Sequence, residues 1–465
     1  MYPNSIFYSI RNEIKETLSI GIPMISSQII YASSGFLGTA MVAQLGENAL
    51  AASVLVSSIW MSLSVLFFGI LNSVCVLVAH QYGAKNEAAI SKIMGQAFIL
   101  AGILCVIMLG ILSSMPLFLH WSNQPPAVLS LARSYMTSLL WTVPGLLTLI
   151  TIEQFLAGIN RAKIVLRISL LVVPIEVPLI YMLIFGKFGL PACGVAGVGY
   201  GFAITYTGTA ICMLIHLNKS HFYQRFGIFK AVNTINFAYL GELFRVGLPM
   251  GLMNVIELST FAFATFWIAR FGTTFLAAHQ IIMQYLGFAI TLVFAMSQAV
   301  TVRVGHAVGE QNLMRVHYAS YVGMGLNFIA VSIISLGFYF IPTFFLHLDM
   351  NILDPKNAPL IRDASSLLSI CAALLIFDNF RIIGFGALRG LKETRFPMFA
   401  SFFSFWVIGL SSAFLFGFTW QFGAKGIWWG LTFGIACGAV IVLLRLGMLL
   451  QTVDLSKILD SKITH

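Results

Sequence analysis

Eight stretches of this sequence contain no Asp, Glu, Lys or Arg, and each is long enough to cross a lipid bilayer. A bilayer core about 30 Å thick requires roughly 20 mainly apolar residues in a helix. Only 9% of the residues are charged and 59% are hydrophobic, whereas about a quarter of the residues of a soluble protein are charged. The chain is therefore predicted to be embedded in a membrane. The charge-free stretches are Leu18 to Gly46, Asn48 to Ala84, Ile93 to Ala132, Phe188 to Asn218, Phe271 to Val302, Val316 to Leu348, Phe396 to Ala424 and Gly426 to Leu444.

Four further apolar stretches each surround one acidic residue, namely Glu153, Glu176, Glu257 or Asp378. Together with the charge-free stretches they predict an all-α membrane protein with twelve transmembrane helices. Continuous apolar runs argue against a β-barrel, whose strands alternate over about ten residues. The predicted helices cover 18–43, 48–81, 93–118, 127–155, 163–185, 192–217, 240–270, 273–305, 315–347, 358–386, 395–417 and 425–451.

The Lys and Arg residues are distributed unevenly over the predicted loops. Nineteen lie at the two termini, in the loops after even-numbered helices or at the helix ends next to them, and six lie in or near the loops on the other side. Because cytoplasmic loops are enriched in Lys and Arg, both termini are predicted to be cytoplasmic. The net charge of +10 follows from this asymmetry, and no stretch combines clustered basic and aromatic residues as a nucleic-acid-binding face would. We expect a multi-pass protein surrounded by lipid in the plasma membrane, the inner membrane in a Gram-negative bacterium, with no nucleic-acid partner.

The sequence matches itself at an offset of 226 residues. GIPM at 21–24 aligns with GLPM at 247–250, and HQYGAKN at 80–86 aligns with HAVGEQN at 306–312. Because six helices are an even number, both copies start on the same side of the membrane, and such parallel repeats enclose a central space. This arrangement favours transport over a merely enlarged bundle. The predicted segments are an N-terminal six-helix lobe (1–217), a cytoplasmic linker (218–239), a C-terminal six-helix lobe (240–451) and a cytoplasmic tail (452–465).

Several motifs resemble those of the multidrug and toxic compound extrusion transporters, specifically the NorM-like branch. The resemblance covers nearly the whole chain and rests on GIPM with GLPM, LAAHQI, VCVLVAHQYGAKN with VTVRVGHAVGEQN, GKFGLPACGVAGVGYG and FGALRGLKETRFPMF. It implies two six-helix bundles around a central cleft that faces alternately to either side of the membrane. It also implies a monomer that exports amphipathic, often cationic small molecules against a sodium or proton gradient, with no cofactor besides the coupling ion.

Glu257 is the strongest candidate for a functional residue. An acidic side chain at the centre of a membrane helix costs about 2.5–3.5 kcal/mol on insertion scales, so it requires an explanation. Glu257 lies about ten residues from either charged end of its predicted helix, near the middle of the membrane. Its carboxyl group can hold a proton, a sodium ion or a substrate ammonium in turn, whereas the alternative is a protonated acid that hydrogen-bonds a neighbouring helix. It matches the family's helix 7 glutamate, and Asn254 lies beside it as a candidate ligand.

Asp378 is a second candidate and matches the helix 10 aspartate of the NorM-like branch. With Glu257 it is a candidate coupling site for a proton or a sodium ion. Arg381, however, lies three residues later on the same helical face, so a structural ion pair with Asp378 is the alternative. The family usually carries a neutral residue at the position of Arg381, and a fixed cation competes with sodium. Asn379, next to Asp378, is a further candidate ligand.

Glu176 lies between Pro174 and Pro178 in its predicted helix. The backbone groups that these prolines leave unpaired are tolerated only inside the protein or beside a cavity. The family commonly has asparagine here, so Glu176 either adds a charge to a substrate or cation site or is a structural acid. The helix 1 aspartate of many relatives is replaced by Gly38, so proton coupling through that position is not expected.

Three other polar residues at membrane depth can have either a functional or a structural role. Gln280 and Gln284 share one face of their predicted helix and are candidate ligands or interhelical hydrogen-bonding groups. Glu153 lies within about two turns of Arg161 and is predicted to be structural, with its carboxyl group reaching the membrane interface.

Other functional classes are less consistent with the sequence. The chain has no HExxH motif, no paired aspartates at metal spacing and no glycine-rich nucleotide loop, so no enzymatic activity is expected. The six cysteines are scattered without a CxxC pair, which argues against disulfides or a zinc site. A flippase for lipid-linked precursors is the alternative transport function, although such proteins usually need a basic cavity for phosphates.

Overall fold

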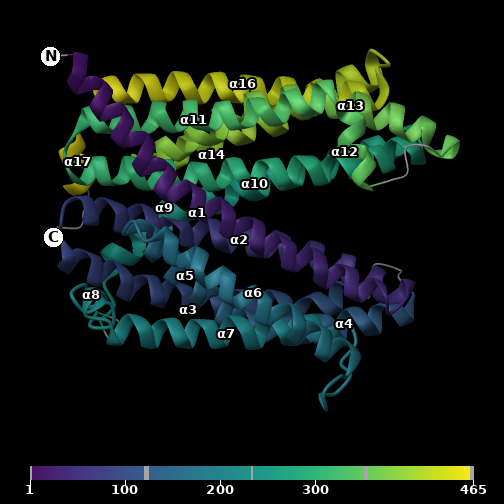
Figure 1. The fold of residues 1–465 in the computed structure, drawn as a ribbon, viewed down its shortest axis with the longest axis horizontal. Helices are drawn as coiled ribbons and strands as arrows, with labels where there is room; N and C mark the ends of the chain where they lie inside the picture. Colours follow the sequence, from purple (N-terminus) through teal and green to yellow (C-terminus); the bar gives the residue numbers. More distant parts are fainter. Residues whose placement is uncertain (1–2, 120–124, 232–233, 350–353, 461–465) are drawn as a thin grey trace. The chain divides into compact units, whose positions relative to one another are not determined.

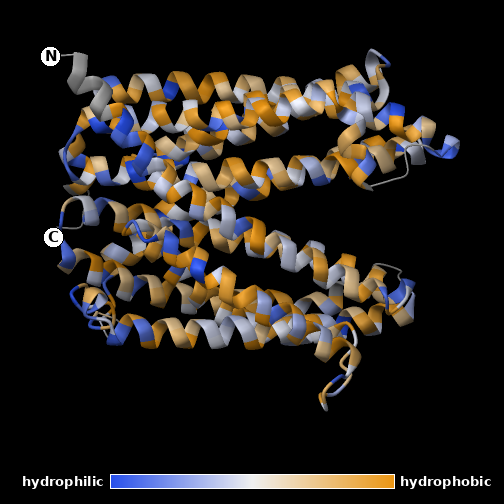
Figure 2. Cartoon of the chain, viewed as in Figure 1, coloured by the Kyte–Doolittle hydropathy of each residue, from blue (hydrophilic) through white to orange (hydrophobic). Residues whose placement is uncertain are grey.

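The computed structural model describes residues 3–119, 125–231, 234–349 and 354–460, which form an array of long helices (Figure 1). Within these residues, eleven helices are long and apolar enough to cross a membrane, or up to twelve when the bent pair α4 and α5 counts as one span. Hydrophobic residues predominate along the helices and hydrophilic ones gather near their ends (Figure 2). The prediction of an all-α, multi-pass integral membrane protein is confirmed.

The chain forms two compact units. Among the described residues, the N-terminal unit comprises Ser26–Gly251, and the C-terminal unit comprises 3–25 with 252–460. The long helices α1 (Pro3–Ala43) and α9 (Phe237–Ile268) therefore each contribute residues to both units. They change unit after Ile25 and after Gly251, positions that are 226 residues apart, as in the sequence repeat. The two units follow from contacts in the structure, whereas the lobes were predicted from the sequence repeat. The lobe boundaries therefore stay a prediction.

The N-terminal unit is built around α5, which packs against α2, α3 and α7. A large apolar core draws residues from these helices and from α6. The chain bends by 46° between α4 and α5, close to Pro144, whose ring cannot continue the hydrogen bonding of the preceding turn. The span predicted at 127–155 is this bent pair. The helices are α2 (Glu47–Gly83), α3 (Glu87–Leu119), α4 (Pro126–Leu140), α5 (Thr142–Gly158), α6 (Ala162–Phe185), α7 (Ala196–Lys219) and the short α8 (His221–Gln224).

The C-terminal unit is built around α13, which packs against α10, α11 and α16. Glycines allow this close approach: a Cβ atom at Gly386 would lie 2.6 Å from the carbonyl oxygen of Ser297 on α10. A Cβ atom at Gly384 would lie 2.6 Å from Val442 on α16. Small residues at such contacts let membrane helices pack closely. The helices are α10 (Thr273–Gly309), α11 (Leu313–Phe340), α12 (Pro342–Asp349), α13 (Ala358–Gly390), α14 (Arg395–Phe402), α15 (Leu410–Phe414), α16 (Gly423–Thr452) and α17 (Leu455–Asp460).

Two predicted spans differ from continuous α-helices. The span predicted at 315–347 is divided into α11 and α12, because Pro342 lacks the backbone N–H that would continue α11. The span predicted at 395–417 contains two π-helical segments, η4 (Phe403–Gly409) and η5 (Leu415–Thr419). Short π-helical insertions in membrane and soluble helices often occur at functional sites. The first of them lies beside the acidic residues described below.

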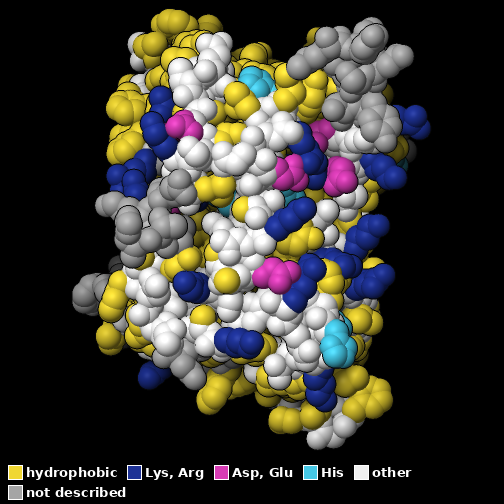
Figure 3. Space-filling model, turned by 90° about the vertical axis from the view of Figure 1, so that its left-hand side faces the viewer, with side chains coloured by type: hydrophobic (Ala, Val, Ile, Leu, Met, Phe, Trp, Pro, Cys, Tyr) yellow, Lys and Arg dark blue, Asp and Glu magenta, His cyan; other side chains and the backbone are white. Residues whose placement is uncertain are grey.

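Basic side chains are exposed at one end of the helices of each unit, the left-hand side of Figure 1, which faces the viewer in Figure 3. In the N-terminal unit this end carries α8 and the adjoining Arg225, whose Nε lies 3.6 Å from Glu87. In the C-terminal unit it carries α17 with Lys457. Both belong to segments that the sequence places on the cytoplasmic side.

Candidate functional site

Arg381 on α13 binds two carboxyl groups inside the C-terminal unit. Its Nε donates a hydrogen bond of 2.7 Å to Oδ1 of Asp378, and its Nη2 lies 2.6 Å from the same oxygen. Its Nη1 donates to Oε1 of Glu257 on α9, and its Nη2 donates to Oε2 of that residue at 3.2 Å. One guanidinium therefore joins the two acidic residues that the sequence singled out. We call these three residues the Arg381 triad.

The Arg381 triad is enclosed by aromatic rings and is unevenly exposed. The guanidinium carbon lies 4.7 Å from the ring centre of Phe405 and 5.3 Å from that of Phe385, distances typical of cation–π contacts. The side chains of Arg381 and Asp378 are only 2% and 3% exposed, whereas that of Glu257 is 16% exposed. Glu257 is thus the member of the triad that a proton, ion or substrate can reach most readily.

The charge of the Arg381 triad follows from its composition. A guanidinium stays protonated in proteins, so Arg381 supplies a permanent positive charge. When both carboxyl groups are ionised, the triad has a net charge of −1. The expected ion pair between Asp378 and Arg381 is present, but it extends to Glu257 on another helix.

Helix packing positions the Arg381 triad. A Cβ atom at Gly438 on α16 would lie 3.3 Å from Cδ of Arg381, so glycine leaves room for this long side chain. The π-helix η4 carries Phe405 and Trp406, and the indole Nε1 of Trp406 donates to the carbonyl oxygen of Ile256 at 3.3 Å. This bond fixes η4 against α9 next to Glu257. Ser401 on α14 lies 3.4 Å from Oε1 of Glu257 and donates its hydroxyl hydrogen.

Two asparagines near the triad have unused hydrogen-bonding capacity among the described residues. Oδ1 of Asn254, one turn before Glu257 on α9, is buried without a hydrogen-bond donor. Asn379 accepts a 2.7 Å bond at Oδ1 from Asn327 on α11, whereas its Nδ2 has no acceptor. Both remain candidate ligands for a substrate or cation.

The structure does not join Gln280 and Gln284 to the Arg381 triad. Both side chains are exposed on α10, and no hydrogen bond within the described part of the chain connects them to Glu257 or Asp378. The neighbouring His279 is buried, and its Nε2 lies 2.8 Å from the hydroxyl of Thr265. The helical period predicted correctly that the two glutamines share a face, but not what this face contacts.

Glu176 is a fully buried acid in the N-terminal unit, and hydroxyl groups surround it. Ser34 on α1 donates to its Oε1, and Thr205 on α7 donates to its Oε2 at 3.2 Å. Helix α6 continues through both of the flanking prolines. Within the described residues, no ion pair connects Glu176 to a Lys or Arg side chain. Three helices therefore meet at a carboxyl group that has no cationic partner.

Glu153 in the same unit also bonds to a hydroxyl group. The phenol of Tyr31 on α1 donates a 2.9 Å hydrogen bond to its Oε1. This bond agrees with the predicted structural role of Glu153 and gives its carboxyl group a partner on α1. A contact between residues 122 positions apart depends on how α1 packs against α5, which no local sequence pattern shows.

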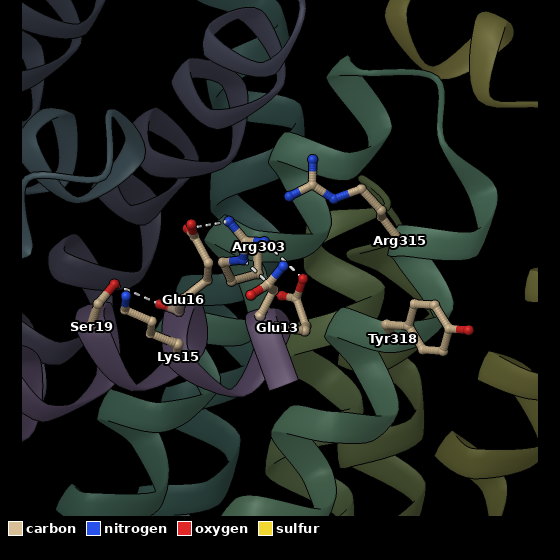
Figure 4. Close-up of a pocket in the computed structure, with 8 residues that line it drawn as sticks. Glu13, Lys15, Glu16, Ser19, Arg303, Arg315 and Tyr318 are labelled. Atoms are coloured by element: carbon tan, nitrogen blue, oxygen red, sulfur yellow. Dashed lines mark hydrogen bonds and ion pairs between the residues drawn. The ribbon is translucent and has the colours of Figure 1, made fainter. Parts of the chain in front are cut away.

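A second arginine with two carboxylates lies near the ends of α1 and α10 in the C-terminal unit (Figure 4). Arg303 donates to both carboxylate oxygens of Glu13 at 2.7 Å and from Nη1 to Glu16 at 2.9 Å. We call these residues the Arg303 triad. It borders a pocket of about 430 Å³ that is also lined by Asn12, Lys15, Ser19, Arg315 and Tyr318.

The sequence did not predict this triad, although Arg303 falls within the helix predicted at 273–305. The residue lies within α10 and is only 4% exposed. A signal was available: Glu13 and Glu16 are three residues apart, which places both carboxylates on one helical face. Their partner on α10 could not be read from this spacing.

Comparison with known proteins agrees with the fold and the motifs. The MatE family model matches residues 23–182 and 249–415. The probable multidrug resistance protein NorM of Pseudomonas putida is 32% identical over 429 residues, which cover 92% of this chain and 93% of that protein. The protein of the same name from Burkholderia mallei is 33% identical over 432 residues, 92% of each chain.

Solved structures show the same fold at lower sequence identity. A eukaryotic MATE transporter superposes with a TM-score of 0.84 and 19% identity, covering 98% of this chain and 99% of that chain. A MATE structure in a bent conformation gives a TM-score of 0.86 with 18% identity and the same coverage of 98% and 99%. The family match covers most of the sequence, and the relatives align over nearly their full length. The chain therefore belongs to the MatE family, whose members are transporters rather than enzymes.

Proposed function

We propose that this protein is a secondary antiporter that exports amphipathic, mainly cationic small molecules in exchange for protons or sodium ions. The two curated relatives described above are named multidrug resistance proteins, which supports a broad range of exported compounds. The fold supports a mechanism of alternating access, in which the binding site opens in turn to each side of the membrane. No bound cofactor is required, because the coupling ion supplies the driving force.

The observation that carries this proposal is the Arg381 triad. With both carboxyl groups ionised the triad has a net charge of −1, and Glu257 is accessible enough to receive a partner. A single negative charge attracts one monovalent cation, which can be the coupling ion or a cationic substrate. Two such cations at the same site would repel each other strongly, because Coulomb energies increase at short distance and low dielectric constant. Binding of one therefore favours release of the other.

The other polar groups have supporting roles in this proposal. Asn254 and Asn379 each offer one buried polar atom that has no partner among the described residues. We propose that they bind polar atoms of the substrate or the ion. Glu176 would provide a second, separate acidic position in the N-terminal unit.

The basic side chains at the helix ends in Figure 3 support an orientation with both termini in the cytoplasm. In this orientation the Arg303 triad lies at the cytoplasmic end of its unit. We propose a monomer in the plasma membrane, which in a Gram-negative cell is the inner membrane.

A flippase for phosphate-bearing lipid precursors is less consistent with the site. Binding a phosphate requires positive charge that is not already neutralised. Arg381 is buried and is bound to two carboxylates, so the triad repels anions rather than attracting them.

The proposal is tested by Glu257→Gln, which removes the accessible charge and keeps the size of the side chain. We expect efflux of a cationic dye such as ethidium to fall by about tenfold or more, as for other substitutions that remove an essential interaction. Efflux is measured in cells with an equal amount of each variant in the membrane.

The matched control is Glu310→Gln, because Glu310 lies in the same unit and binds the partly exposed Arg315 outside the triad. This control is expected to retain the efflux rate of the wild-type protein. Wild-type efflux by Glu257→Gln would contradict the proposed site.

A further inference from the structure

We propose that Arg381 is the residue that selects the coupling ion, and that it makes this protein respond to protons and not to sodium. The inference rests on the proposed function, because it names the ion that the antiporter uses. Its basis is that a tethered cation already occupies the space between Glu257 and Asp378.

The hydrogen bonds of the triad leave little room for sodium. Three carboxylate oxygens bind the guanidinium, namely Oδ1 of Asp378 and both oxygens of Glu257. A hard cation in a protein collects several oxygen ligands around itself. Sodium would therefore have to share these oxygens with Arg381 and lie within a few ångströms of a permanent positive charge. Electrostatic repulsion at that separation opposes binding.

A proton avoids both obstacles. It forms a bond with one carboxylate oxygen of Glu257 and needs no shell of ligands. When it binds, Glu257 becomes neutral and its ionic interaction with Arg381 is lost. Arg381 remains bound to Asp378 through two contacts on the same helix. The charge of the triad changes from −1 to zero, and release of the proton to water restores the original state.

The net charge at this site is set by the three residues of the triad. The charges that act on Arg381 are those of Asp378 and Glu257, and those that act on Asp378 are Arg381 and Glu257. Among the described residues, the thiol of Cys371 on α13 is a further titratable group that feels the charge of Asp378. The other neighbours that the described residues supply are uncharged, namely Ser401 on α14, Phe405 on η4, Phe385 on α13, Gly438 on α16, and Asn379, which is bonded to Asn327 on α11.

The Arg303 triad offers an internal control with the same chemistry. It also joins one guanidinium to two carboxylates in the C-terminal unit. Glu16 in that triad has a side chain that is 45% exposed, so water already screens part of its charge. We propose no role for the Arg303 triad in the exchange of ions and substrate.

The first experiment uses the wild-type protein in proteoliposomes with ethidium as the probe. Proton and sodium gradients are imposed separately at a clamped membrane potential. We expect the proton gradient to accelerate ethidium exchange by about tenfold, within the usual range of coupling between two ligands, and the sodium gradient to leave it unchanged. Exchange driven by sodium alone would overturn the inference but support the proposed antiport. Exchange that responds to neither gradient would overturn the proposed function itself.

The second experiment removes the tethered cation. In detergent, the thermal unfolding midpoint is measured in sodium chloride and in choline chloride for Arg381→Gln, Arg381→Lys and Arg303→Gln. We expect sodium to raise the midpoint of Arg381→Gln specifically, because the two carboxylates become available to it. Arg381→Lys keeps the positive charge, so its midpoint should not respond to sodium. Arg303→Gln frees Glu13 and Glu16, but water already screens the 45% exposed Glu16, so its response should be smaller than that of Arg381→Gln. An equal response of all three variants, or a sodium-specific response of the wild-type protein, would overturn the inference. If Arg381→Gln does not fold, the wild-type measurements still decide the question.

Discussion

The two units place acidic residues inside membrane-spanning helices in different ways. In the C-terminal unit, Glu257 and Asp378 share the guanidinium of Arg381. In the N-terminal unit, Glu176 binds the hydroxyls of Ser34 and Thr205. Glu153 in the same unit binds the phenol of Tyr31. A hydroxyl satisfies the hydrogen-bonding capacity of a carboxyl group without supplying a charge. A guanidinium supplies both.

This difference determines what each acid can contribute. Around Arg381, at least one carboxylate must be ionised if the buried cation is to be compensated, because an uncompensated buried charge is costly. The second carboxylate is then free to exchange partners. Glu176 lacks a cationic partner in the described structure, so its bonding is satisfied by groups that stay neutral. We therefore expect the C-terminal unit to be sensitive to loss of charge and the N-terminal unit to be sensitive to loss of hydrogen bonds.

The largest effect on stability is expected for Arg381→Gln. This change leaves two acidic side chains in the interior without their cation, and breaking a buried ion pair by removing one partner costs about 3–5 kcal/mol. The free energy of unfolding is measured by denaturant titration in detergent micelles. The double variant Asp378→Asn with Arg381→Gln is expected to recover part of the loss, because it removes one of the two uncompensated charges. If the single variant is as stable as the wild-type protein, the guanidinium is not needed for charge compensation and the comparison fails.

The second-largest effect on stability is expected in the N-terminal unit, when the phenol that binds Glu153 is removed. Tyr31→Phe removes the donor of the 2.9 Å bond and leaves the carboxyl oxygen without it. A buried polar group that loses its partner costs about 1–3 kcal/mol. The same denaturant titration gives the loss, and Tyr339→Phe on α11 is the control, because that side chain is 60% exposed. Equal stability of both variants would show that the bond to Glu153 contributes nothing.

The sequence predicted the spans well because a lipid environment leaves few alternatives. Unsatisfied backbone groups are too costly in hydrocarbon, so long apolar runs must become helices. The two spans that are not continuous α-helices have different causes. Pro342 was visible in the sequence and ends α11, whereas the π-helical segment that carries Phe405 depends on contacts with other helices. One such contact is the 2.6 Å bond from the Ser404 hydroxyl to the carbonyl oxygen of Gly434 on α16.

The site could be predicted only in part for a similar reason. Glu257 and Asp378 stand out because charged residues are rare inside membranes, and the three-residue spacing suggested the pair of Asp378 with Arg381. The bond from Arg381 to Glu257 joins residues 124 positions apart, so it depends on the packing of α9 against α13. The same limit explains why the pairing of Arg303 with Glu13 and Glu16 was not predicted. Helical periodicity shows which residues share a face but not what that face meets.

The smallest effect is expected for Glu176→Gln. Glutamine keeps an acceptor oxygen of similar position, and its amide can donate to whichever hydroxyl loses its acceptor. The loss in the free energy of unfolding should therefore stay within about 1 kcal/mol, close to the contribution of one neutral hydrogen bond. Glu176→Ala removes all of these bonds and is the matched variant that should lose more. A loss for Glu176→Gln as large as that for Arg381→Gln would mean that the charge of Glu176 is essential, so that both units hold their buried acids by charge.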